Sequence, residues 1–142
     1  MKTIRVQADL KAINAIRDFM RGALDGVAFS DDESSSISLA VHEICVNIVL
    51  YAYPEEKGTI DLKTWMEDNR MWIEIRDVGV PFDPRTAADP DIREKVHSAR
   101  MGGWGIYLTR SLMDSFDYRR ENGENILLLS KKFPGPDSGK PA

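Results

Sequence analysis

The chain has 142 residues, of which 42% are hydrophobic and 30% charged. This composition is typical of one compact folded domain and excludes a disordered, collagen-like or disulfide-rich chain. A formal net charge of -4 argues against nucleic acid or an anionic membrane as a partner. The single cysteine, Cys45, has no partner for a disulfide, and we expect no export signal or membrane span, so the sequence predicts a cytoplasmic protein.

The chain length and the lack of a linker-like segment before the tail predict a single domain over residues 1–133. A disordered tail rich in proline and glycine is expected over residues 134–142. A short strand is expected over residues 3–7. An amphipathic helix that ends at Gly26 is then predicted from apolar residues at three- and four-residue steps: Leu10, Ile13, Ile16, Phe19, Met20 and Leu24.

A second helix is expected to begin at Ser30 or Asp31, since either residue can cap it, and to end before Pro54. Its predicted buried stripe consists of Ile37, Val41, Ile44, Ile48 and Ala52. The pattern then changes from a helical period to an alternation of two, which indicates strands.

A two-residue turn at Asp68 and Asn69 fixes the register of the hairpin that follows. The cross-strand pairs predicted on one face are Asp61 with Arg76, Lys63 with Glu74, and Trp65 with Trp72. The alternation places Asp77 on the opposite, apolar face, where an unpaired carboxylate is costly. We therefore expect a partner for Asp77. The tryptophan pair stabilises the hairpin, with protein contact as a second possible role.

Residues 78–101 show no clear period, and a segment of this length is typical of a functional lid. Within it, residues 82–101 are expected to be mobile without nucleotide and to become ordered when nucleotide binds. A third helix is predicted from Gly102 to Met113. Two closing strands, over residues 116–120 and 125–132, meet at Asn122 and Gly123. These elements predict an α+β fold, a two-layer α/β sandwich in which a mostly antiparallel mixed sheet carries helices on one face.

Three groups of residues are candidates for chemistry. Glu43, Asn47 and Tyr51 stand four residues apart on the second helix, which fits either a solvated helix face or a catalytic carboxylate beside an amide ligand of Mg²⁺. Asp77 and Gly79 end a strand, either as a simple turn or as a carboxylate that accepts from the amine of adenine while the glycine allows close approach.

The third group is a glycine cluster, Gly102, Gly103 and Gly105, at the start of a predicted helix. It fits a flexible hinge or, because free N–H groups at a helix start bind anions, a phosphate site. Its spacing is that of neither a Walker loop nor a Rossmann fingerprint.

In chain order, the segments EICVNIVLYAY (43–53), DVGVPFDP (77–84) and GGWGIYL (102–108) resemble the N, G1 and G2 boxes of the Bergerat-fold, histidine-kinase-like ATPase superfamily. The best match is the anti-sigma factor serine/threonine kinase family, and the resemblance extends from about Ile4 to Phe133. The sequence departs from that family at Tyr51, where many members carry histidine, and at Glu124, where threonine is often found.

The resemblance implies a role for each matching position. Glu43 orients or deprotonates the attacking hydroxyl, Asn47 binds Mg²⁺, Asp77 reads adenine, and Gly79 allows close approach. The phosphate cradle is formed by Gly102, Gly103 and Gly105. Arg100 either adds positive charge near the γ-phosphate or is a solvated lid residue.

The family further implies a homodimeric kinase that uses ATP and Mg²⁺, phosphorylates an anti-anti-sigma factor and sequesters a sigma factor. A non-catalytic, nucleotide-dependent protein-binding module is the alternative. The detached catalytic domain of a histidine kinase is a third possibility, disfavoured because the chain has no room for a dimerisation hairpin with a phospho-accepting histidine.

Overall fold

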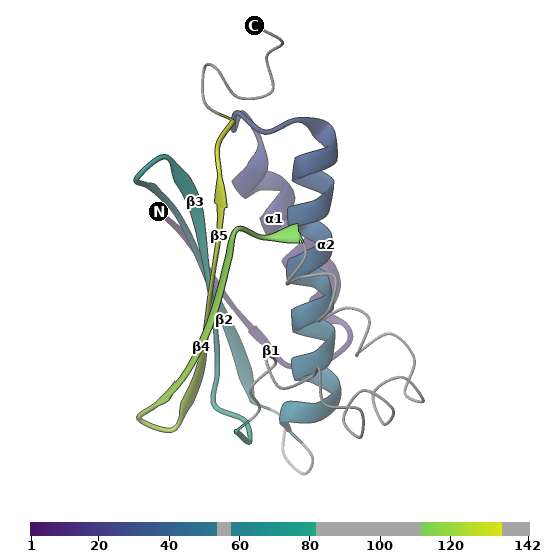
Figure 1. Ribbon diagram of the computed structural model, residues 1–142. Helices are drawn as coiled ribbons and strands as arrows, with labels where there is room; N and C mark the ends of the chain where they lie inside the picture. The colour runs from purple at the N-terminus through teal and green to yellow at the C-terminus, as the bar shows by residue number, and fades with distance from the viewer. Residues whose placement is uncertain (54–57, 82–111, 135–142) are drawn as a thin grey trace, which may run out of the picture.

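The computed structural model describes residues 1–53, 58–81 and 112–134 (Figure 1). Its elements are, in chain order, β1 (Lys2–Gln7), α1 (Ala12–Leu24), α2 (Asp31–Asn47), the π-helical turn η1 (Ile48–Ala52), β2 (Thr59–Glu67), β3 (Arg70–Asp77), β4 (Ser115–Glu121) and β5 (Glu124–Lys132). The strands form one sheet in the order β1-β2-β3-β5-β4, and α1 and α2 cover one of its faces (Figure 1). This confirms the predicted α+β two-layer architecture.

Every neighbouring pair of strands in the described residues is antiparallel, so the expected mixed character of the sheet is not seen there. The core lies between the inner face of the sheet and the two helices. Its fully buried large side chains are Ile16, Met20, Ile37, Val41, Ile60, Leu62, Met71, Ile73, Ile75 and Leu129.

The first helix begins later than its apolar pattern predicts. The Asp9 carboxylate accepts a hydrogen bond from the Ala12 backbone N–H at 2.9 Å, and α1 starts at Ala12. Leu10 therefore precedes the helix and is 64% exposed, so its predicted place on the buried stripe is wrong. Ile16 and Met20 lie on that stripe, each 1% exposed.

The second helix begins with a capping box, in which Ser30 and Glu33 bond reciprocally. The Ser30 hydroxyl accepts from the Glu33 N–H at 3.1 Å, and the Glu33 carboxylate accepts from the Ser30 N–H at 3.0 Å. The predicted start at Ser30 or Asp31 is thus confirmed. The whole predicted apolar stripe is buried.

Length and hydropathy alone would allow Asp31–Ala52 to cross a membrane, and it is the one such helix in the described ranges. Half of its most apolar window is buried inside the fold. Packing against the sheet accounts for the apolar character of this helix, as for the core helix of any two-layer domain.

The β2–β3 hairpin has the predicted register in every pair. Asp68 and Asn69 adopt positive φ angles of 53° and 62°, as a two-residue hairpin turn requires. The Trp65 and Trp72 rings stack with centroids 6.2 Å apart and planes inclined by 10°.

On this outer face, Asp61 and Arg76 lie opposite each other in the hairpin, but each forms its ion pair with a different residue. Asp61 pairs with Arg5 (Nε to Oδ1, 2.6 Å), because β1 joins the free side of β2 and places Arg5 opposite it. Arg76 pairs with Glu74, two residues away on the same strand (2.8 Å). The predicted register therefore holds, whereas one ion pair forms with the neighbouring strand β1 and the other along β3 itself.

The β4–β5 hairpin turns at Asn122 and Gly123, as predicted, with φ angles of 52° and 79°. Strand β5 lies between β3 and β4 and places Asn125 opposite Asp77. Residues 82–101 of the predicted lid, most of the predicted third helix and the tail after Pro134 lie outside the described residues.

Candidate functional site

The end of the long helix is fastened to the ends of two strands. The Val80 N–H donates to the Ala52 carbonyl at 2.8 Å. The Tyr53 hydroxyl donates to the Thr59 carbonyl at 2.8 Å and accepts from the Val78 N–H at 2.9 Å. These bonds hold η1 against the start of β2 and the end of β3, so groups on the helix and at the strand end keep fixed relative positions.

Gly79 packs closely against the end of the helix. A Cβ at Gly79 would overlap the Ala52 carbonyl oxygen and lie 2.6 Å from the Ala52 Cβ. The structure therefore shows a packing reason for glycine at this position: the backbone after β3 lies directly against the helix end. Contact of Gly79 with a purine remains a prediction.

We expect Gly79→Ala to destabilise the fold by about 1–3 kcal/mol, because backbone atoms of the helix end must move to admit the methyl group. Chemical denaturation measures this change. Gly22→Ala is the matched control, since a Cβ there meets nothing within 4 Å and alanine favours the helix. Equal stability of Gly79→Ala and the unaltered protein would contradict the packing role.

Asp77 ends β3 on the inner face of the sheet and is 4% exposed. Its Oδ1 accepts two hydrogen bonds of 2.9 Å each, from the Gly79 N–H and the Asn125 side-chain amide. The expected partner of this carboxylate is thus confirmed and is Asn125. Burial raises the pKa of Asp77, while the two hydrogen bonds and the positive charge of Arg120 oppose that increase.

Sequence reasoning missed Asn125, which is 3% exposed. It pointed instead to Glu124, which the pleat turns to the outer face, 3.7 Å from Arg76. A signal was present, because alternation along β5 places Asn125 on the same face as Leu127 and Leu129, making it a polar residue at a core position. The alternation does not indicate, however, that β5 lies beside β3.

Glu43 and Asn47 lie one turn apart on α2, 6% and 4% exposed. The Asn47 Nδ2 donates to the Glu43 backbone carbonyl at 3.0 Å, which sets the orientation of the amide and turns its Oδ1 away from that carbonyl. Burial raises the pKa of Glu43, partly opposed by the charge of neighbouring His42. Because Glu43 and Asn47 are buried, they do not form a solvated helix face, which was one of the two interpretations of the sequence.

An amide oxygen is a ligand that Mg²⁺ accepts, and Mg²⁺ usually takes one or two protein ligands while phosphate and water supply the others. The buried Asn47 amide fits this requirement. The predicted line of polar residues at four-residue spacing ends at Asn47 and does not include Tyr51. The reason is that η1 begins at Ile48, and its π-helical turn is wider than an α-helical turn. In the described part of the chain, the buried Tyr51 hydroxyl has no hydrogen-bond partner.

The helix and the strand end also interact electrostatically. Cys45, which lies between Glu43 and Asn47, is fully buried, and its pKa is raised by burial and then by the negative charge of Asp77. The structure thus places Asp77 and Gly79 against the later part of the helix formed by α2 and η1, the part in which Glu43 and Asn47 lie. The remaining candidates lie outside the described residues: Arg100, Gly102, Gly103 and Gly105.

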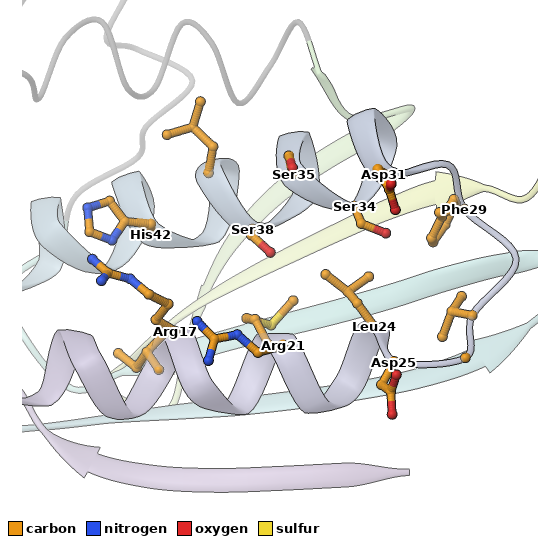
Figure 2. Close-up of a pocket in the computed structure, with 15 residues that line it drawn as sticks. Arg17, Arg21, Leu24, Asp25, Phe29, Asp31, Ser34, Ser35, Ser38 and His42 are labelled. Carbon is orange, nitrogen blue, oxygen red and sulfur yellow. The ribbon is translucent and has the colours of Figure 1, made fainter.

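A separate groove of about 710 Å³ runs between α1 and α2. Figure 2 shows Arg17 and Arg21 on α1 across from Ser34, Ser38 and His42 on α2. Of the site candidates that the structure describes, namely Glu43, Asn47, Asp77 and Gly79, none lines this groove. It is therefore distinct from the cluster around Asp77.

Comparison with known proteins agrees with this arrangement. A family model described as "Histidine kinase-like ATPase domain" matches residues 6–131. The Acinetobacter baumannii histidine kinase AdeS has a similar fold, with a TM-score of 0.52 at 10% identity, over 94% of this chain and 69% of that one. The chain therefore belongs to the histidine kinase-like ATPase family.

Curated relatives narrow the family further. Serine-protein kinase RsbW of Bacillus thuringiensis (strain Al Hakam) is 30% identical over 129 residues, which cover 88% of this chain and 81% of the relative. Serine-protein kinase RsbW of Bacillus anthracis is 31% identical with the same coverage. These relatives place the chain in the serine-protein kinase branch, as its resemblance to the anti-sigma factor kinases predicted.

Proposed function

We propose that this protein is an ATP-binding, Mg²⁺-dependent serine/threonine protein kinase that phosphorylates an anti-anti-sigma factor and sequesters a sigma factor. The observation that carries the proposal is the buried Asp77 carboxylate. Its Oδ1 accepts two N–H donors, and no described residue donates to its Oδ2. A buried acceptor that lacks a donor suits an exocyclic amine such as that of adenine.

Glu43 is the proposed catalytic base. Phosphoryl transfer needs mainly positioning and neutralisation of charge, together with a group that orients or deprotonates the attacking hydroxyl. The burial that raises the pKa of Glu43 brings the carboxylate closer to the pH at which a general base works best.

Asn47 is the residue proposed to hold Mg²⁺, which when bound would neutralise phosphate charge. The phosphates themselves are assigned to Gly102, Gly103 and Gly105, with added charge from Arg100; these assignments rest on the resemblance. Residues 1–133 form the proposed catalytic domain.

The proposed partners follow from the family. Relatives named serine-protein kinases support a protein serine as the phosphate acceptor. A homodimer in the cytoplasm is part of the proposal. The net charge of -4 supports protein partners over nucleic acid or an anionic membrane.

We expect phosphoryl transfer at saturating ATP·Mg²⁺ to depend on the protonation of Glu43. The base must be deprotonated, so turnover is present above its pKa and is lost as the pH falls through it. Because burial raises that pKa above the ordinary value of 4.5, the loss is expected at higher pH than for a solvated glutamate. A pH series of kcat measures this, and a constant kcat down to pH values below the ordinary one would contradict the assignment.

Calorimetric titration with ATP·Mg²⁺, followed by transfer of a radiolabelled γ-phosphate to candidate anti-anti-sigma proteins, tests the proposed function. Binding together with labelling of a partner serine is the expected result. Binding without labelling of any cognate partner would replace the kinase by a non-catalytic regulatory module, and acid-labile phosphohistidine would indicate a histidine kinase. Absence of binding would overturn the proposal as a whole.

A further inference from the structure

Asn125 has every hydrogen-bonding position of its side chain occupied. Its Nδ2 donates to Asp77 Oδ1 at 2.9 Å and to the Val80 carbonyl at 2.8 Å. Its Oδ1 accepts from the Tyr118 hydroxyl at 2.6 Å and from Arg120 Nη1 at 3.1 Å. A flipped amide would face acceptors with its oxygen and donors with its nitrogen, so these four contacts fix its orientation.

This fixed amide determines which oxygen of Asp77 can change its protonation. Oδ1 accepts from both Asn125 and Gly79, so its two lone pairs are used. A proton on Asp77 must therefore sit on Oδ2. Oδ2 is also the oxygen that the proposed function assigns to the ligand.

We propose that Asn125 is a positioning residue that sets the base specificity of the nucleotide site by holding Asp77 as an ionised acceptor through Oδ2. This inference rests on the proposed function. A 6-aminopurine donates to such an oxygen, whereas a 6-oxopurine presents a second acceptor and is repelled. Once Oδ2 is protonated, it donates instead of accepting, and the preference for the 6-aminopurine is lost.

Arg120, on β4, binds both of the residues that donate to Asp77. Besides its bond to Asn125, its Nη1 donates to the Gly79 carbonyl at 2.7 Å and so joins β4 to the backbone after β3. Asn125 and Gly79 are the two residues that donate to Asp77, and the same guanidinium holds both. A change at Arg120 is therefore expected to act on Asp77 indirectly.

The titratable groups of the described residues that act on Asp77 come from three elements. Arg120 on β4 is positive and lowers the pKa of Asp77. Cys45 on α2 and Tyr53 after η1 have pKa values raised mainly by burial, so both are neutral near pH 7. Arg120 and the two N–H donors are thus the groups that keep Asp77 ionised.

The test compares the affinities for ATP and ITP, each with Mg²⁺, in the full chain across a pH series. The unaltered protein is expected to prefer ATP near neutral pH and to lose that preference on acidification. In Asn125→Leu we expect the preference to fall by about tenfold, the effect of losing one hydrogen bond to a charged group. The pH at which ATP affinity is lost is expected to rise, because Asp77 loses a donor that favours its ionised form.

Arg120→Met provides a second variant, at an exposed position. It is expected to change the ATP preference and its pH dependence in the same direction as Asn125→Leu, but by a smaller amount. Ser130→Ala is the matched control: Ser130 is 0% exposed on the same strand and bonds to Arg70 and Ser115. Ser130→Ala is expected to be less stable than the unaltered protein, but to keep the same ratio of ATP to ITP affinity and the same dependence of ATP affinity on pH.

The outcomes separate the inference from the proposed function. If the unaltered protein binds neither nucleotide, the proposed function fails. If it binds ATP while folded Asn125→Leu and Arg120→Met keep both the ratio and the pH profile, the inference about Asn125 is overturned and the proposed function stands. The same conclusion follows if Arg120→Met alone folds and is unchanged.

Discussion

Replacing Glu43 by glutamine is expected to lower phosphoryl transfer by about 10²- to 10⁴-fold, the usual contribution of a general base. ATP affinity should stay within a few-fold, because the side chain keeps its shape and does not contact Asp77 in the proposed arrangement. Single-turnover transfer and calorimetric binding, measured on the same preparation, separate the two quantities.

Glu33→Gln is the matched control for Glu43→Gln. Glu33 lies on the same helix, and its carboxylate accepts from the Ser30 N–H in the capping box, a bond that glutamine can also accept. This control variant should transfer phosphate at the normal rate. Unchanged turnover in Glu43→Gln would remove Glu43 from the mechanism.

The second large effect is expected at Asp77, where Asp77→Asn should weaken ATP binding by about 10- to 100-fold, since a hydrogen bond to a charged acceptor is lost. The substituted amide keeps the size of the carboxylate, and its oxygen can still accept from Gly79 and Asn125. Its nitrogen then occupies the Oδ2 position and meets the amine of adenine as a second donor. Calorimetric titration measures the change.

Asp61→Asn is the matched control for this substitution. Asp61 lies on the neighbouring strand β2 and on the opposite face of the sheet, where it pairs with Arg5. An isolated surface pair of this kind contributes little to stability, so its loss is expected to leave nucleotide affinity unchanged. ATP affinity that is equally unaffected in Asp77→Asn would show that the base does not bind there.

Local patterns were sufficient for those parts of the fold that depend on local geometry. The register of β2 and β3 follows from the turn at Asp68 and Asn69, and the inward orientation of Asp77 follows from that register. The start of α2 follows from the capping box at Ser30. Each of these features is fixed by residues close together in sequence.

Features that depend on distant segments were not predictable in this way. The partnership of Asp77 with Asn125 requires β5 to lie between β3 and β4, and the ion pair of Asp61 requires β1 beside β2. Period and turn signals specify which face a side chain takes, but they do not specify which strand lies next to it.

Two further departures have local causes that the apolar pattern conceals. Leu10 continues a helical spacing, yet the Asp9 side chain bonds to Ala12 and the helix starts there. The π-helical turn at Ile48–Ala52 breaks the spacing between Asn47 and Tyr51 although its residues continue the apolar stripe. The four-residue spacing therefore correctly places Glu43 and Asn47 one turn apart on the helix, but it does not place Tyr51 in line with them.

Structure determination with a non-hydrolysable ATP analogue and Mg²⁺ tests the central claim most directly. The account predicts the adenine amine within hydrogen-bonding distance of Asp77 Oδ2, with the Asn125 amide still bonded to Oδ1. A base bound in the groove between α1 and α2, or elsewhere without contact to Asp77, would contradict it.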